Sequence, residues 1–69
     1  MNLQTRFATN VRILRKKKNL SQKDIAAKTG ISISYVSMLE HGQRSPPLET
    51  IEMIAKALGV RAEALLSRM

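Results

Sequence analysis

The side chains with the most evident chemistry in this chain are its cations, and they are unevenly placed. The 69 residues include 12 Lys and Arg against 5 Asp and Glu, for a net charge of +7. Eight of the cations fall in residues 1–28 with a single carboxylate, Asp24, whereas the remainder of the chain is neutral. Neutralising phosphates releases counterions, so such a region favours a polyanion as its partner. A basic surface that serves only solubility is the alternative.

Catalytic and metal chemistry find little support in the sequence. There is no Cys, and the single His41 follows Glu40, so on a helix the two side chains diverge. No paired carboxylates, phosphate-binding glycine loop or metal-ligand spacing is present. We therefore predict that the protein is not an enzyme and uses no cofactor and no metal.

The spacing of small and apolar residues over positions 22–41 is typical of two short helices joined by a tight turn. Ala26 lets the second helix approach the first, and Gly30 supplies the left-handed turn four positions later. An apolar residue directly after the glycine seals the turn, and Val36 and Leu39 follow as inward anchors. Together these features predict a DNA-binding helix-turn-helix. An ordinary helical hairpin is the alternative.

Capping residues and apolar periodicity predict an all-α chain that folds as one compact domain of five helices over residues 1–69. The third helix is expected to run from a Ser32 cap through His41, and Pro47 fits the first position of the fourth. The other expected helices span residues 3–17, 22–29 and 61–67, and the fourth ends at residue 58.

The order and spacing of these segments resemble the lambda-repressor-like (Cro-type or XRE) helix-turn-helix domains over residues 7–66. The Asn-Val-Arg start and the Tyr-Val-Ser of the third helix look most like the controller proteins of restriction–modification systems, with phage-type repressors close behind. The matching stretches are Asn10-Val-Arg-Ile-Leu-Arg15, Leu20-Ser-Gln-Lys-Asp-Ile-Ala26, Gly30-Ile-Ser32, Tyr35-Val-Ser-Met-Leu-Glu-His-Gly42, Ser45-Pro46 and Ala55-Lys-Ala-Leu-Gly-Val60.

The resemblance implies that the third helix enters the major groove of duplex DNA. Ile33 and Met38 cannot make the paired hydrogen bonds that read adenine or guanine, so they are expected to pack on thymine methyl groups. Direct readout is then modest, and DNA shape carries part of the specificity. The candidate DNA-binding residues are Gln22, Lys23, Ser32, Ile33, Ser34, Tyr35, Ser37, Met38 and Arg44.

These candidates divide by the part of the DNA that they are expected to meet. The resemblance makes Gln22 a phosphate ligand at a helix start, and Ser32 combines capping with a phosphate contact. Tyr35 reaches a phosphate or is a half-buried surface tyrosine. Arg44 meets the backbone or a minor groove, or is a free loop cation, and Lys23 contributes long-range attraction. Ile33 and Met38 also have purely structural alternatives, as packing at the helix start and as filler.

Glu40 would repel phosphate if it were free on the third helix. In related domains the arginine that matches Arg15 pairs with the glutamate that matches Glu40. We therefore predict a partly buried ion pair of Arg15 and Glu40 that ties the first helix to the third. Two independent surface charges are the alternative.

One recognition helix reads too little sequence for useful discrimination, so we predict a homodimer on a palindromic operator. The candidate interface residues are Val60, Leu65, Leu66 and Met69. An antitoxin that binds its own operator and a nonspecific nucleic-acid-binding protein are the alternatives. No apolar run is long enough for a membrane span, and we expect a cytoplasmic protein.

Overall fold

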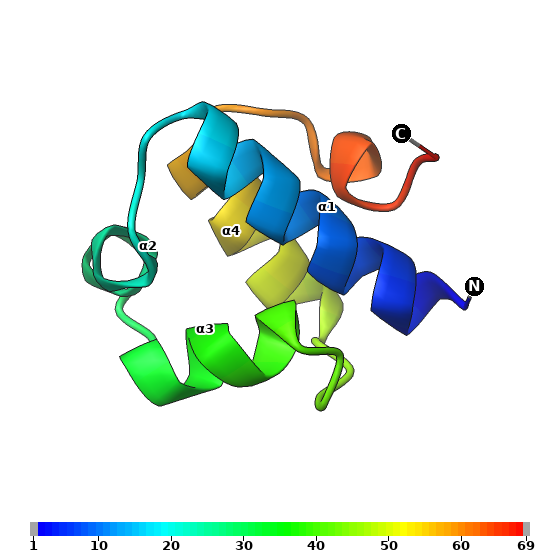
Figure 1. Cartoon of the computed structure of the whole chain (residues 1–69), viewed down its shortest axis with the longest axis horizontal. Coiled ribbons are helices and arrows are strands. Elements are labelled where there is room, and N and C mark those ends of the chain that lie inside the picture. The colour runs from blue at the N-terminus through cyan, green and yellow to red at the C-terminus, as the bar shows by residue number, and fades with distance from the viewer. Residues whose placement is uncertain (1, 69) are drawn as a thin grey trace.

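The computed structural model describes residues 2–68, which form four α-helices and a short 3-10 helix. These residues contain no strand, so the predicted all-α class is confirmed. Figure 1 shows α1 crossing the molecule in front of α4, with α3 along one edge and both termini on one side. The elements are α1 (Leu3–Lys17), α2 (Gln22–Thr29), α3 (Ile33–Glu40), α4 (Leu48–Leu58) and η1 (Ala62–Leu65).

All five elements contribute to one apolar core. Phe7 and Val11 of α1 are almost fully buried against Ile54 and Leu58 of α4, and Leu65 of η1 is completely buried. Burying a side chain of this size contributes about 1.5–3 kcal/mol relative to leaving it exposed. The short helices α2 and α3 therefore derive their stability from this core more than from their own backbone hydrogen bonds.

Two predicted helix boundaries differ from the structure by one residue. Helix α3 ends at Glu40, and His41 is its C-cap rather than its last helical residue. Pro47 is the N-cap of α4 and not its first residue, with φ −67° and ψ 162° in the extended region. That conformation suits a proline, because the ring fixes φ and the helix start needs no N–H there.

The prediction of a fifth α-helix over residues 61–67 is wrong, because this segment forms only the 3-10 turn η1. Its backbone hydrogen bonds join residues three apart, from Ala64 N–H to Arg61 O at 3.0 Å and from Leu66 N–H to Glu63 O at 3.1 Å. The buried side chain of Asn10 in α1 holds the carbonyls at the end of this turn. Its amide nitrogen donates to Leu65 O at 2.9 Å and Ser67 O at 2.7 Å, with a longer contact to Ala64 O at 3.4 Å, so these carbonyls are satisfied without a further helical turn.

None of the helices formed by residues 2–68 combines the length and the apolarity that crossing a bilayer requires.

Candidate nucleic-acid interface

Helix α2 and the turn that follows it are set by local side-chain chemistry. Ser21 and Asp24 form a reciprocal capping box, with Ser21 Oγ accepting from Asp24 N–H at 2.9 Å and Asp24 Oδ2 accepting from Ser21 N–H at 2.8 Å. The backbone N–H of Ser21 and then its hydroxyl lower the pKa of Asp24. At the other end Gly30 has φ +80°, and its N–H donates to Ala26 O at 2.8 Å. Only glycine adopts this conformation without strain, so Gly30 fixes the turn.

Helix α3 has one side in the core and one side in solvent. Ser32 caps it, since its Oγ accepts from Tyr35 N–H at 3.0 Å. Val36 and Leu39 are buried, whereas Ser34 is exposed and Ile33 is 48% exposed at the start of the helix. The exposed side chain of Ile33 is therefore accessible to a binding partner.

The outer face of α3 is the set of candidate residues that remains accessible on this helix and its cap. It consists of Ser32, Ile33, Ser34, Ser37 and Met38, of which Ser37 and Met38 are partly exposed. This face carries hydroxyl and apolar groups and no charge. It can therefore lie against base edges without repelling the phosphates on either side.

The inner end of α3 is held by a group of side chains that we call the Glu40 cluster: Glu40, Arg12, Arg15 and Gln22. Arg15 binds the Glu40 carboxylate with two hydrogen bonds, Nε to Oε2 at 2.6 Å and Nη2 to Oε1 at 3.0 Å. Gln22 Nε2 donates to Glu40 Oε1 at 3.2 Å, and Arg12 Nη1 donates to the Glu40 backbone carbonyl at 3.1 Å. The cluster thus ties α3 to both α1 and α2.

The Glu40 cluster is largely buried, so its charged groups need partners within the protein. The side chain of Glu40 is only 1% exposed and that of Arg15 is 12% exposed. Arg15 also donates to Leu20 O at 3.0 Å, and its hydrogen bonds to the Glu40 carboxylate raise the pKa of Arg15 above its ordinary value. The predicted pair of Arg15 and Glu40 is therefore present, and it neutralises the one carboxylate of α3 before it can face a phosphate.

The structure places Gln22 in a role that the sequence did not suggest. Its side chain is half-buried at the start of α2 and joins the Glu40 cluster, where the sequence predicted a phosphate contact. Sequence reasoning also missed Arg12. Arg12 donates to the backbone carbonyl of Glu40, and the available signal was that the last carbonyls of a helix lack partners within it.

The other candidates lie around the outer face of α3 without forming part of it. Lys23 and Arg44 are exposed, on α2 and in the loop after α3. Tyr35 is half-buried and packs against the core. His41 lies at the end of α3, where its Nδ1 donates to Ser37 O at 2.7 Å. The described part of the chain holds no group of three side chains able to bind a metal ion.

One of the candidate dimer residues is not on the surface. Leu65 is completely buried in the core of its own chain, so its assignment to an interface is wrong. Val60 and Leu66 are half-buried against the core, and Met69 lies outside the described residues. Two exposed apolar side chains line a hollow with Leu66, namely Leu48, which is 75% exposed, and Leu3, which is 60% exposed.

Comparison with known proteins assigns the fold and its motif to a family. The profile of the helix-turn-helix family HTH_3 matches residues 11–65, which cover α2, the turn and α3. The chain belongs to this helix-turn-helix family. The resemblance to lambda-repressor-like domains is thereby confirmed.

Similar proteins of this family include control proteins of restriction–modification systems. The chain is 39% identical over 66 residues to the control protein C.BamHI of Bacillus amyloliquefaciens, a match covering 94% of this chain and 82% of that protein. The crystal structure of the controller protein C.AhdI from Aeromonas hydrophila superimposes with a TM-score of 0.86 at 37% identity, covering 90% of this chain and 94% of that one.

A third similar helix-turn-helix structure contains DNA. The controller protein C.Esp1396I, solved as a tetramer in complex with its natural 35-base-pair operator, superimposes with a TM-score of 0.86 at 25% identity. The match covers 94% of this chain and 86% of that chain.

Proposed function

We propose that the protein is a regulator of transcription that binds duplex DNA as a homodimer, with α3 in the major groove. The observation that carries this proposal is the uncharged outer face of α3, exposed on a helix whose inner end is held by the Glu40 cluster. Family membership and the operator complex of C.Esp1396I support it. A cytoplasmic location, which the sequence predicts, is part of this proposal.

The proposed readout combines apolar and hydroxyl contacts with basic anchoring. Ile33 and Met38 would cover thymine methyl groups, and Ser34 and Ser37 would bond to base edges of either type. Phosphates would be bound by Ser32, by the first turn of α2 and by the exposed cations Lys23 and Arg44. Such contacts position the domain, and the sequence-dependent shape of the DNA adds specificity.

We propose that the dimer forms through an apolar surface at the start of α4, which keeps Leu66 of the predicted residues and adds exposed neighbours. Leu3, Leu48, Ile51 and Leu66 line two adjoining hollows together with Pro46, from α1, α4 and the segments beside them. A second copy related by a two-fold axis would bury this surface and place two α3 helices on half-sites about 34 Å apart.

Selection of random duplexes on the purified protein tests the function. A palindromic motif is expected, with A·T pairs under the outer face of α3. The variant Ile33→Ala should relax the preference at one position of each half-site. The matched control Ile13→Ala, another exposed isoleucine at 43% exposure but on α1, should leave the motif unchanged. Enrichment without any shared motif would contradict sequence-specific binding.

Sedimentation of the free protein tests the dimer separately. Leu48→Lys should convert a dimer to a monomer, because it places a charge in the buried surface. Ile13→Lys carries the same change on an exposed site outside the surface and should stay dimeric. A wild-type chain that sediments as a monomer in free solution and on operator DNA would overturn this part of the proposal.

A further inference from the structure

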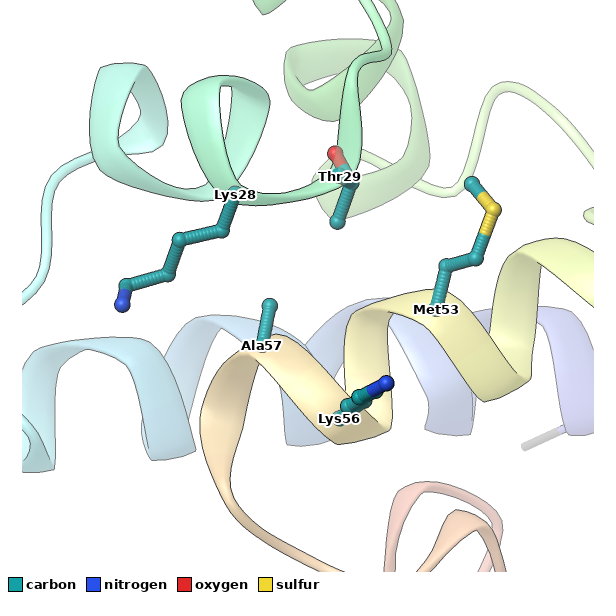
Figure 2. A pocket seen from close by; sticks show the side chains of 5 residues that line it. All are labelled: Lys28, Thr29, Met53, Lys56 and Ala57. Atoms are coloured by element: carbon teal, nitrogen blue, oxygen red, sulfur yellow. The ribbon is translucent and has the colours of Figure 1, made fainter.

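A groove runs between α2 and α4, outside the Glu40 cluster and the outer face of α3. It encloses about 390 Å³ and is lined by Lys28, Thr29, Met53, Lys56 and Ala57. Figure 2 shows Ala57 pointing into the space between the two helices, with Lys28 extended along the groove and Met53 at its other end. The groove thus has a small apolar centre and a cation on each helix.

The two lysines of this groove lie in the last turns of α2 and α4, where a cation complements the helix dipole. Both are exposed, and the ion pairs formed within residues 2–68, Arg15 with Glu40 and Arg61 with Glu63, leave them out. Asp24 lies one turn before Lys28 on α2 and attracts it, but the Asp24 carboxylate accepts its hydrogen bond from Ser21 N–H. Both ammonium groups can therefore pair with carboxylates of a partner.

The groove is also not needed for the proposed DNA contact. Lys28 belongs to the last turn of α2, whereas the end of that helix proposed to meet phosphates is its first turn. The Thr29 hydroxyl donates to Ile25 O at 2.7 Å, which leaves it no hydrogen for a phosphate. Lys56 and Met53 lie on α4, which contributes no residue to the outer face of α3.

We propose that this groove binds an acidic segment of another protein, with one apolar side chain of the segment seated between carboxylates. Met53 is 38% exposed beside Ala57, and an apolar side chain of the segment would cover both. Carboxylates on either side of that group would pair with Lys28 and Lys56. A DNA backbone offers phosphates but no apolar side chain that projects between them, so charge and apolarity together favour a protein segment.

Since the groove and the outer face of α3 use different residues, the regulator can hold this segment while it is bound to DNA. The proposal does not depend on which operator the protein reads. It predicts that an acidic partner and a duplex bind at the same time.

The test is an amide NMR titration with defined probes. The probe is a short alanine-rich helical peptide that carries one leucine between pairs of glutamates, and a second peptide replaces the glutamates with glutamine. The acidic peptide should move the amide signals of the residues that line the groove and leave those of α3 in place. The double variant Lys28→Ala/Lys56→Ala should weaken binding about tenfold, since each exposed ion pair contributes a factor of about three.

The matched control is Lys16→Ala/Lys17→Ala, which removes the same number of charges from α1. It should lower the affinity for the acidic peptide less than twofold, because distant charges are screened by salt. Both double variants should bind operator DNA with equal affinity, so failure of the groove is distinguishable from failure of the DNA proposal. The proposal would be overturned if both double variants lowered the affinity for the acidic peptide equally. It would also be overturned if the glutamine peptide bound as tightly as the acidic one, or if an unrelated duplex moved the groove signals more than the acidic peptide does.

Discussion

The inner and outer sides of α3 differ in how far their side chains are buried and in what they contact. On the inner side Val36 and Leu39 are almost fully buried, and Glu40 is bound by side chains from two other helices. On the outer side Ile33 and Ser34 are exposed to solvent. The difference indicates that one set of residues sets the position of the helix and another set meets the DNA. Substitutions should therefore separate stability from DNA affinity.

The largest expected effect is on the inner side. Arg15→Ala would leave the Glu40 carboxylate buried without its cation, and we expect a loss of about 3–5 kcal/mol in the free energy of unfolding. Urea denaturation followed by circular dichroism measures it. The control Arg68→Ala removes an exposed arginine and should change stability by less than about 0.5 kcal/mol.

A double-mutant cycle sharpens this prediction. Glu40→Ala alone should be strongly destabilising, and the Arg15→Ala/Glu40→Ala pair should cost less than the sum of the single variants. A coupling energy near zero would show that the two charges act independently. It would contradict the inference that the inner side of α3 positions the helix through this ion pair.

The next effect should appear on the outer side, in DNA affinity and not in stability. Ile33→Ala is expected to weaken operator binding about tenfold, because it removes apolar contact with base methyl groups. Its free energy of unfolding should stay within about 0.5 kcal/mol of wild type. Fluorescence anisotropy and urea denaturation give the two values, with Ile13→Ala as the control. A large stability loss in Ile33→Ala would show that the outer side also positions the helix.

A smaller effect is expected at the edge of the outer side, where Arg44 is exposed in the loop after α3. Arg44→Ala should weaken binding to all duplexes alike and lower the slope of log affinity against log salt by about one. Titrations over a range of salt concentration measure this slope. If the variant instead lost preference at one base pair only, Arg44 would be reading sequence.

The smallest effect concerns the cap of α2 and depends on pH. Because the pKa of Asp24 is lowered in the folded chain, its stabilisation is complete above the ordinary Asp pKa of about 3.9 and is lost as the pH falls through the lower folded value. Asp24→Asn should therefore melt at a lower temperature than wild type at neutral pH, and the gap should close in acid. Glu52→Gln, on an exposed site of α4, is the control. A gap that persists in acid would exclude the carboxylate as its cause.

The parts of the fold that local chemistry determines were predictable. The bounds of α1 and α2 agree with the sequence prediction, and those of α2 do so because Ser21 and Gly30 act on their immediate neighbours. The segment around η1 was not predictable, because its carbonyls are taken by Asn10, more than 50 residues away. A polar residue on the apolar side of α1 gives no indication of which segment it will bind.

The candidate site was predictable in its exposed residues and less so in its buried ones. Helical spacing distinguishes Ile33 and Ser34 from the inward Val36, whereas neighbouring apolar residues such as Leu65 and Leu66 give no such contrast. The side-chain amide of Gln22 can donate a hydrogen bond to a phosphate or to a carboxylate. Only the tertiary position of Glu40 decides between the two.

The attachment of α3 by its final glutamate has a consequence for how new binding preferences arise. Since Glu40 holds the helix from its inner side, the side chains of the outer face can be exchanged one at a time without changing the contacts that position the helix. A small set of exchanged side chains would then redirect the protein to another promoter, which makes this domain a ready template for evolution and for engineering alike.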